Sequence, residues 1–95
     1  MNTYYTEYVN HLFRYYFSLS EPQDTVNYRC VSLALASLSP EERDIIRAVY
    51  AVRTRRMSDA VATVAADKGV PAYSVYSVLR SAARMVASER GLIDG

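Results

Sequence analysis

Residues 58–90 read SDAVATVAADKGVPAYSVYSVLRSAARMVASER, and this stretch decides the fold. Two runs with helical periodicity flank a short break at residues 69–71. Ala65 precedes Gly69 by four residues, and three valines follow the glycine at one, six and nine residues: Val70, Val75 and Val78. Helix-turn-helix motifs require this spacing, because the two helices cross closely at the alanine and the glycine takes a left-handed conformation. A generic helical hairpin is the alternative.

The second helix of this stretch has two different faces. At about 100° per residue, its apolar side holds Val75, Val78, Leu79, Ala82 and Val86. Its other side holds Tyr73, Tyr76, Ser77, Arg80 and Arg84. An exposed stripe of arginine, tyrosine and serine is typical of a nucleic-acid-binding face, although arginine is also common on ordinary solvated helix surfaces.

The composition is that of one compact, helix-rich domain. The chain has 95 residues, of which 51% are hydrophobic, with three glycines and three prolines, so we expect a single modest core. No apolar run approaches the roughly 20 residues that span a bilayer, and no secretory signal is visible. A lone cysteine, Cys30, favours a reducing setting. We therefore expect a cytoplasmic protein without a membrane partner.

The net charge of +1 hides an asymmetry between the two halves of the chain. Residues 1–46 carry three arginines and six acidic residues, whereas residues 47–95 carry eight basic and four acidic residues, which gives −3 and +4. Ten of the eleven basic residues are arginine, which suits bidentate contacts with phosphate or bases better than lysine does. The positive half is also the half that contains the helix-turn-helix pattern.

Two helices are expected in the first 38 residues. Residues 3–19 have a helical period but carry aromatic residues around the whole cylinder, which predicts packing against two neighbours or a second copy of the chain. A second helix begins after Asp24, which is expected to cap it. Its apolar residues predict a mostly buried helix: Val26, Cys30, Val31, Leu33, Ala34, Leu35 and Leu38.

The clearest helix start in the chain is Ser39-Pro40-Glu41-Glu42, where Ser39 and Glu42 form a capping box around a proline at the first helical position. This third helix is expected to end near Arg53. Ser58 or Asp59 is expected to cap the fourth helix. The fifth is expected at 72–89, with Leu92 and Ile93 folding back on the core. The prediction is an all-α, five-helix bundle forming a single domain, with an aromatic helical hairpin at 1–37 and the helix-turn-helix region at 38–95.

Two segments, LSPEERDIIRAVYA at 38–51 and SDAVATVAADKGVPAYSVYSVLRSAARMV at 58–86, carry a resemblance to a known family. They resemble region 4, the C-terminal DNA-binding region of sigma-70-type transcription factors, which small phage or mobile-element regulators share. Leu38, Glu41 to Arg43, the Ile45-Ile46 pair and Tyr50 match its leucine, acidic-basic stretch, aliphatic pair and aromatic residue. The resemblance implies a bacterial or phage transcription regulator, with double-stranded DNA and RNA polymerase as partners. The aromatic helix at 3–19 suggests a second copy of the chain, in a homodimer, as a further partner.

In this interpretation the helix that begins at Ala72 lies in the major groove. Four residues are expected to approach base edges, namely Tyr73, Ser74, Ser77 and Arg80, with Tyr76 on the same side of the helix. Four are expected to contact phosphate: Arg53, Arg55, Arg56 and Arg84. One continuous positive patch over Arg53–Arg56, Arg80 and Arg84 would favour DNA binding.

The alternative is a protein-interaction module that keeps the fold without binding DNA. Tyr73, Tyr76 and Arg80 would then anchor an interface, because tyrosine and arginine are favoured there. A scattered pattern of positive charge would favour this function. No enzyme is expected, because the sequence has no nucleophile–base constellation, no glycine-rich phosphate loop and no clustered metal ligands. For the same reason no cofactor is expected.

Overall fold

Five segments separated by caps and turns form the helices of the computed structural model, which describes residues 6–54 and 56–91. The helices are α1 (Thr6–Ser18), α2 (Val26–Ala36), α3 (Pro40–Ala51), α4 (Met57–Lys68) and α5 (Ala72–Glu89). No strand occurs in the described ranges, so the predicted all-α, five-helix fold is confirmed. None of the described helices is long and apolar enough to cross a membrane. Residues 3–5 of the first predicted helix, Arg55, Leu92 and Ile93 lie outside the described residues.

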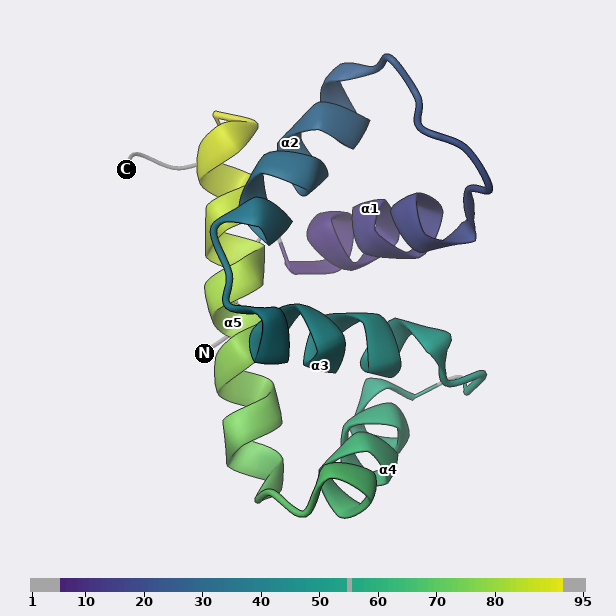
Figure 1. The fold of residues 1–95 in the computed structure, drawn as a ribbon, viewed down its shortest axis with the longest axis vertical. Helices are drawn as coiled ribbons and strands as arrows, with labels where there is room; N and C mark the ends of the chain where they lie inside the picture. The colour runs from purple at the N-terminus through teal and green to yellow at the C-terminus, as the bar shows by residue number, and fades with distance from the viewer. Residues whose placement is uncertain (1–5, 55, 92–95) are drawn as a thin grey trace.

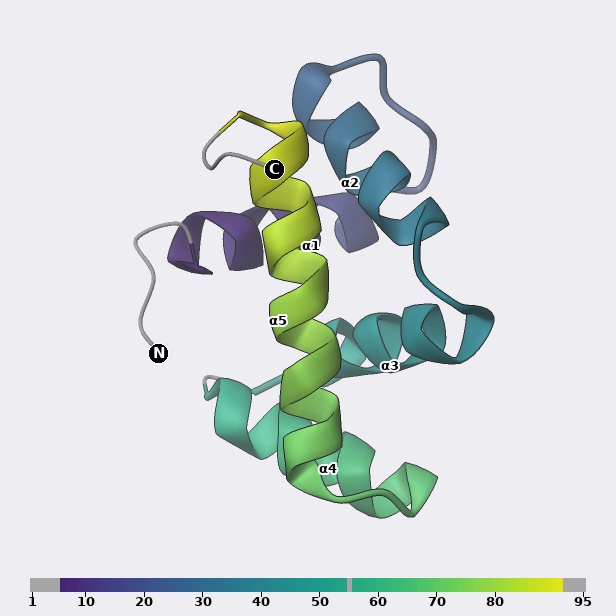
Figure 2. The same cartoon turned by 90° about the vertical axis from the view of Figure 1, so that its left-hand side faces the viewer.

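Helix α5 is the axis of the bundle and packs against each of the other four helices. Its N-terminal half lies beside α4 and α3, and its C-terminal half lies beside α2 and α1 (Figure 1). The view turned by 90° shows the same order along α5 (Figure 2). The pair α4 and α5 that forms the helix-turn-helix therefore meets at one end of the molecule, and α2 lies at the other.

Two clusters of buried apolar side chains fill the space along α5. The first joins α1, α2, the C-terminal half of α5 and one side of α3, and it includes Val9, Leu12, Phe13, Val31, Leu35, Leu38, Ile46 and Val86. The second joins α3, α4 and the N-terminal half of α5: Val49, Ala60, Val61, Val64, Ala65 and Val75. Leu79 of α5 packs against both clusters and so links the two halves of the core.

The start of α3 is confirmed. The Ser39 hydroxyl oxygen accepts a hydrogen bond from the Glu42 amide at 3.2 Å, and the Ser39 amide donates to the Glu42 carboxylate at 3.0 Å. These two bonds satisfy amide groups that a helix start otherwise leaves without partners. The helix ends at Ala51, before the predicted Arg53, because Val52 turns to an extended conformation with φ −73° and ψ 124°.

The cap and the burial of α2 differ from the prediction. Thr25 caps this helix instead of Asp24, because its hydroxyl oxygen accepts the Tyr28 amide at 3.1 Å. The helix is also less buried than expected. Val26 is 52% exposed and Leu33 is 54% exposed, since both lie on the side of α2 that faces away from the bundle.

The start of α4 was also predicted wrongly. The helix begins at Met57, ahead of both Ser58 and Asp59, and no side chain caps it. The Arg56 carbonyl accepts the Asp59 amide at 3.1 Å, which closes the first turn through the backbone alone. The Asp59 carboxylate instead accepts the Thr54 hydroxyl at 3.5 Å, so it braces the connection between α3 and α4.

The aromatic side chains of α1 pack mostly within the chain. The rings of Phe13 and Tyr50 stack with centroids 5.2 Å apart, and Phe17 stacks on Phe13 at 6.2 Å. Tyr16 packs against Tyr28 of α2 with centroids 4.7 Å apart. Helix α1 therefore packs within the chain against three helices, α2, α3 and α5, one more than the two neighbours that were predicted.

Candidate nucleic-acid interface

The turn between α4 and α5 has the backbone geometry that the sequence predicts. Gly69 lies in the left-handed region with φ 68° and ψ 34°. The Val70 amide donates to the Ala65 carbonyl at 3.0 Å, and the Gly69 amide donates to the Ala66 carbonyl at 3.4 Å, as in a Schellman motif. Val70 then packs against the second cluster, which fixes the direction in which α5 leaves the turn.

One face of α5 remains open to solvent from its first turn to its fourth. Val75, Ala82 and Val86 are buried on the opposite side. Five exposed residues form the open face, and we call them the α5 stripe: Tyr73, Ser77, Arg80, Ser81 and Arg84. Their spacing of three or four residues places them in one row along the helix.

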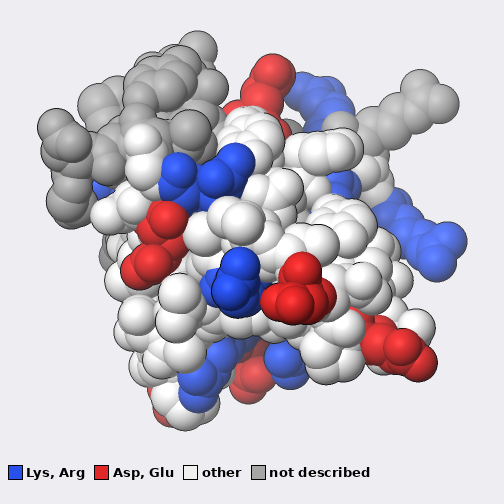
Figure 3. Space-filling model, turned by 90° about the horizontal axis from the view of Figure 1, so that it is seen from above, with Lys and Arg blue, Asp and Glu red and all other residues white. Residues whose placement is uncertain are grey.

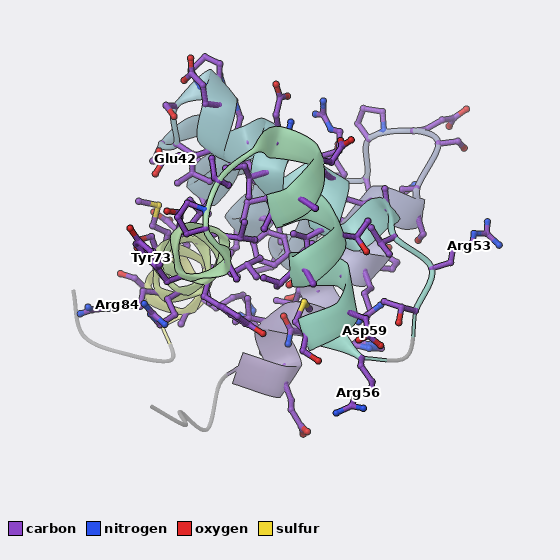
Figure 4. All side chains as sticks on the ribbon, turned by 90° about the horizontal axis from the view of Figure 1, so that it is seen from below. Glu42, Arg53, Arg56, Asp59, Tyr73 and Arg84 are labelled. Atoms are coloured by element: carbon purple, nitrogen blue, oxygen red, sulfur yellow. The ribbon has the colours of Figure 1, made fainter. Side chains whose placement is uncertain are left out.

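Tyr73 is the most exposed large hydrophobic side chain among the described residues, at 73%. It lies at the second position of α5, directly after the turn. The view from below shows Tyr73 and Arg84 on the same side of the molecule, both pointing away from α4 (Figure 4). A ring with this exposure contributes little to the core, so it is free to contact a partner.

Two residues that were predicted to lie on this face are less accessible to a binding partner than predicted. Tyr76 is half-buried and packs against the second cluster, beside Val75 and Leu79. Ser74 is also half-buried, and its amide donates to the Pro71 carbonyl at 3.0 Å. The helical wheel alone misassigns Tyr76 because α3 and α4 both pack on the first turns of α5 and bury a wider arc of it.

The basic residues predicted to contact phosphate fall into separate groups. Arg53 and Arg56 flank the connection between α3 and α4, and both are exposed. Figure 4 shows these two residues on the opposite side of the view from Tyr73 and Arg84, with Asp59 beside Arg56. Arg55 lies outside the described residues. The labelled arginines therefore do not form one continuous positive patch, and the α5 stripe is the part of the predicted site that the fold brings together.

The charged residues of the α5 stripe itself are both positive, although Glu89 lines the same surface pocket as Ser81 and Arg84. No acidic residue occurs between positions 70 and 88, which include both stripe arginines. The far end of the molecule differs, because basic and acidic side chains are interspersed over that surface (Figure 3). The lone lysine, Lys68, is exposed at the last position of α4 and adds a positive charge next to the turn.

Perturbed titratable groups lie away from the stripe. Burial raises the pKa of Tyr50, an effect that the nearby Arg14 opposes. Burial and the neighbouring Tyr16 raise the pKa of Tyr28, and the hydrogen bond to Tyr8 raises that of Arg90. Within residues 6–54 and 56–91, no group of three or more histidine, cysteine or acidic side chains is placed to hold a metal ion. The chemistry of the stripe is therefore that of hydrogen bonding, apolar contact and positive charge.

The sequence analysis missed one residue of the open face, Ser81, which is exposed in the stripe. The signal for Ser81 was present, because it follows Tyr73 and Ser77 at intervals of four residues, which is a helical repeat.

Comparison with models of protein families found no match, and comparisons with curated proteins and with solved structures found none either. The function of the stripe therefore has to be argued from its own geometry and residue chemistry.

Proposed function

We propose that this chain is a DNA-binding transcription regulator that places α5 in the major groove of duplex DNA. One observation carries the proposal: the α5 stripe follows directly on a left-handed glycine turn, and none of the other four helices covers it. A recognition helix needs such a free face at its N-terminal end, because the residues there contact the base edges.

The electrostatics of this end support the proposal. Arg80, Arg84 and Lys68 are exposed on or next to α5, and α5 has no acidic residue before Glu89 at its last position. Binding to DNA gains much of its free energy from releasing counterions when basic side chains neutralise phosphates. The resemblance to sigma region 4 extends the proposal to a bacterial or phage regulator that also contacts RNA polymerase. It gives no reason to expect a cofactor.

A protein-interaction module is the second candidate, and the divided charge favours it. Arg53 and Arg56 lie across the molecule from Tyr73 and Arg84, so fewer arginines can reach one duplex together than the sequence suggested. An exposed tyrosine beside arginine is also a common anchor of protein interfaces. The two candidates differ in how strongly binding depends on salt.

The test measures binding to a pool of duplex fragments at two salt concentrations. We expect the affinity of the wild type to fall steeply as salt rises, because counterions compete for the phosphates. Arg80→Ala and Arg84→Ala should each weaken binding, and the loss of one phosphate contact should reduce the salt slope by about one. All these positions are exposed, so the variants should fold normally.

Arg29→Ala is the matched control, because Arg29 is an exposed arginine on α2, away from the α4–α5 end. It removes the same charge and should leave the affinity and the salt slope nearly unchanged. If the wild type binds no duplex even at low salt, the DNA-binding proposal fails and the interaction module takes its place. If Arg29→Ala weakens binding as much as Arg84→Ala does, the α5 stripe is not the binding face.

A further inference from the structure

The exposed surface of the first two turns of α5 has an unusual composition for a helix that contacts bases. Ala72, Tyr73 and Ser77 are exposed there, whereas Val75 is buried and Tyr76 is turned toward the second cluster. The side chains presented by this part of the helix are thus a methyl group, a phenol ring and a single hydroxyl. Residues 72–79 include no arginine, lysine, asparagine or glutamine.

Those missing residue types are the ones that recognise purines by paired hydrogen bonds. Arginine and lysine read guanine in this way, and asparagine and glutamine read adenine. The first side chain on α5 able to make two parallel hydrogen bonds is Arg80, which lies eight residues from the start of the helix, or about 12 Å along its axis. Arg84 lies about 6 Å further along.

This order along the helix separates two kinds of contact. When the N-terminal end of a helix enters the major groove, its first residues meet the base edges, and later residues lie closer to the phosphates that border the groove. Arg80 and Arg84 are therefore placed for phosphate contacts. Tyr73 and Ser77 are left as the side chains that reach the bases.

Thymine is the base whose groove edge suits this surface. It alone among the four bases carries a methyl group in the major groove, and apolar side chains recognise that methyl by contact. We propose that α5 recognises the methyl groups of thymine through the ring of Tyr73, so that the preferred site contains a thymine at the position this ring reaches. This inference rests on the DNA-binding function proposed above and names what that same surface selects.

The experiment first selects a preferred duplex from a randomised pool at low salt, using the full chain. Each thymine of the selected site is then replaced in turn by deoxyuridine, which lacks only the methyl group and keeps every hydrogen-bonding group. We expect one or two positions at which deoxyuridine weakens binding of the wild type about fourfold, as for the loss of one buried methyl.

Variants of the stripe assign the effect to a residue. In Tyr73→Ala the ratio of affinities for thymine and deoxyuridine at those positions should fall to about one. Once the ring is gone, removing the methyl group that it contacts has nothing further to lose, as in a double-mutant cycle. Tyr73→Phe keeps the ring and should keep the ratio. Ser77→Ala changes the neighbouring exposed residue and should also keep it. The exposure of Tyr73 and Ser77 makes a folding defect in these variants unexpected.

The possible failures are distinguishable. If the wild type binds duplex DNA but no deoxyuridine substitution weakens it, or if Tyr73→Ala retains the ratio of the wild type, the methyl inference is overturned while the DNA-binding function stands. If the wild type binds no duplex at low salt, the proposed function itself is overturned, and the methyl inference falls with it.

Discussion

Gly69 sets the direction of α5 by its backbone conformation alone. Its φ of 68° lies in the region that other residues adopt at a cost, and a Cβ atom built there would meet no atom within 4 Å. Any penalty for a side chain at this position therefore comes from the backbone and not from a clash. The turn differs in this respect from the buried positions on either side of it, where the cost of a substitution depends on the volume of the side chain.

Substitution of Gly69 should destabilise the fold in a graded way. We expect Gly69→Ala to lower the free energy of unfolding by about 1–2 kcal/mol, and Gly69→Val to lower it further because the branched side chain resists this conformation. Gly69→Asn is the control and should cost less, since asparagine tolerates left-handed backbone. Urea unfolding measures all three. An unchanged midpoint for Gly69→Val would refute the assignment of the turn.

Tyr73 and Tyr76 lie three residues apart yet should respond differently to truncation. Tyr76 packs against the second cluster, so Tyr76→Ala should destabilise the protein by about 2 kcal/mol. Tyr73→Ala should change stability by no more than about 0.5 kcal/mol, because its ring is largely exposed. Thermal unfolding compares the two. Equal stabilities would contradict the burial of Tyr76. Tyr73 is consequently the better probe of binding.

At the scale of the helices, a contact between α1 and α3 joins the N-terminal hairpin to the rest of the fold. The Tyr50 ring stacks on the Phe13 ring, and the Arg14 guanidinium lies 5.8 Å from the Tyr50 ring centroid. The Tyr50 hydroxyl donates to the Asn10 side-chain oxygen. Burial raises the pKa of this hydroxyl, so the folded protein keeps its proton at pH values where the unfolded chain loses it.

This difference makes stability depend on alkaline pH. The contribution of Tyr50 is fully present below about pH 10, where tyrosine in the unfolded chain is still protonated, and it is lost as pH rises further. Tyr50→Phe should flatten the fall in stability above pH 10, at a cost of about 1 kcal/mol at neutral pH for the lost hydrogen bond. Unfolding curves from pH 8 to 11 measure the effect, with Tyr73→Phe as control. A Tyr50→Phe profile parallel to that of the wild type would contradict it.

Helix boundaries were predictable where the sequence offers one clear signal; at α2 the neighbouring Asp24 and Thr25 are both capping residues, and Thr25 makes the cap. The capping box at Ser39 and the left-handed Gly69 are local signals, and both were found. The start of α4 was missed because only the backbone closes its first turn, and Asp59 bonds to Thr54 instead. The environment of Tyr76 could not be read from one helix, since it depends on how α3 and α4 pack on α5. The same limit hid the separation of Arg53 and Arg56 from the stripe.

At the scale of the whole molecule, the packing of α1 removes the reason for expecting a dimer of the free protein. Phe13, Tyr16 and Phe17 pack within the chain, so the aromatic content of α1 no longer calls for a second copy. The outer face of α1 is exposed and carries Glu7, His11, Arg14, Tyr15 and Ser18. A homodimer remains proposed only as two copies bound side by side on DNA, where half-sites about one helical turn apart would double the weak contacts.

The free protein should therefore be a monomer. Light scattering at tens of micromolar should give a mass near 10.7 kDa, and addition of a duplex with two suitably spaced sites should give a complex with two chains. A dimer in the absence of DNA would show that the free protein has an interface that this account does not include.

The claim that the α5 stripe is the DNA-binding face can be tested most directly by mapping amide chemical shifts during a titration with duplex DNA at low salt. The largest changes should fall on the amides of residues 73–84 and of Lys68, beside the turn, while those of α2 around Arg29 and Leu33 should stay in place. Changes centred on α2, or no change on any amide at a saturating concentration of duplex, would contradict the claim.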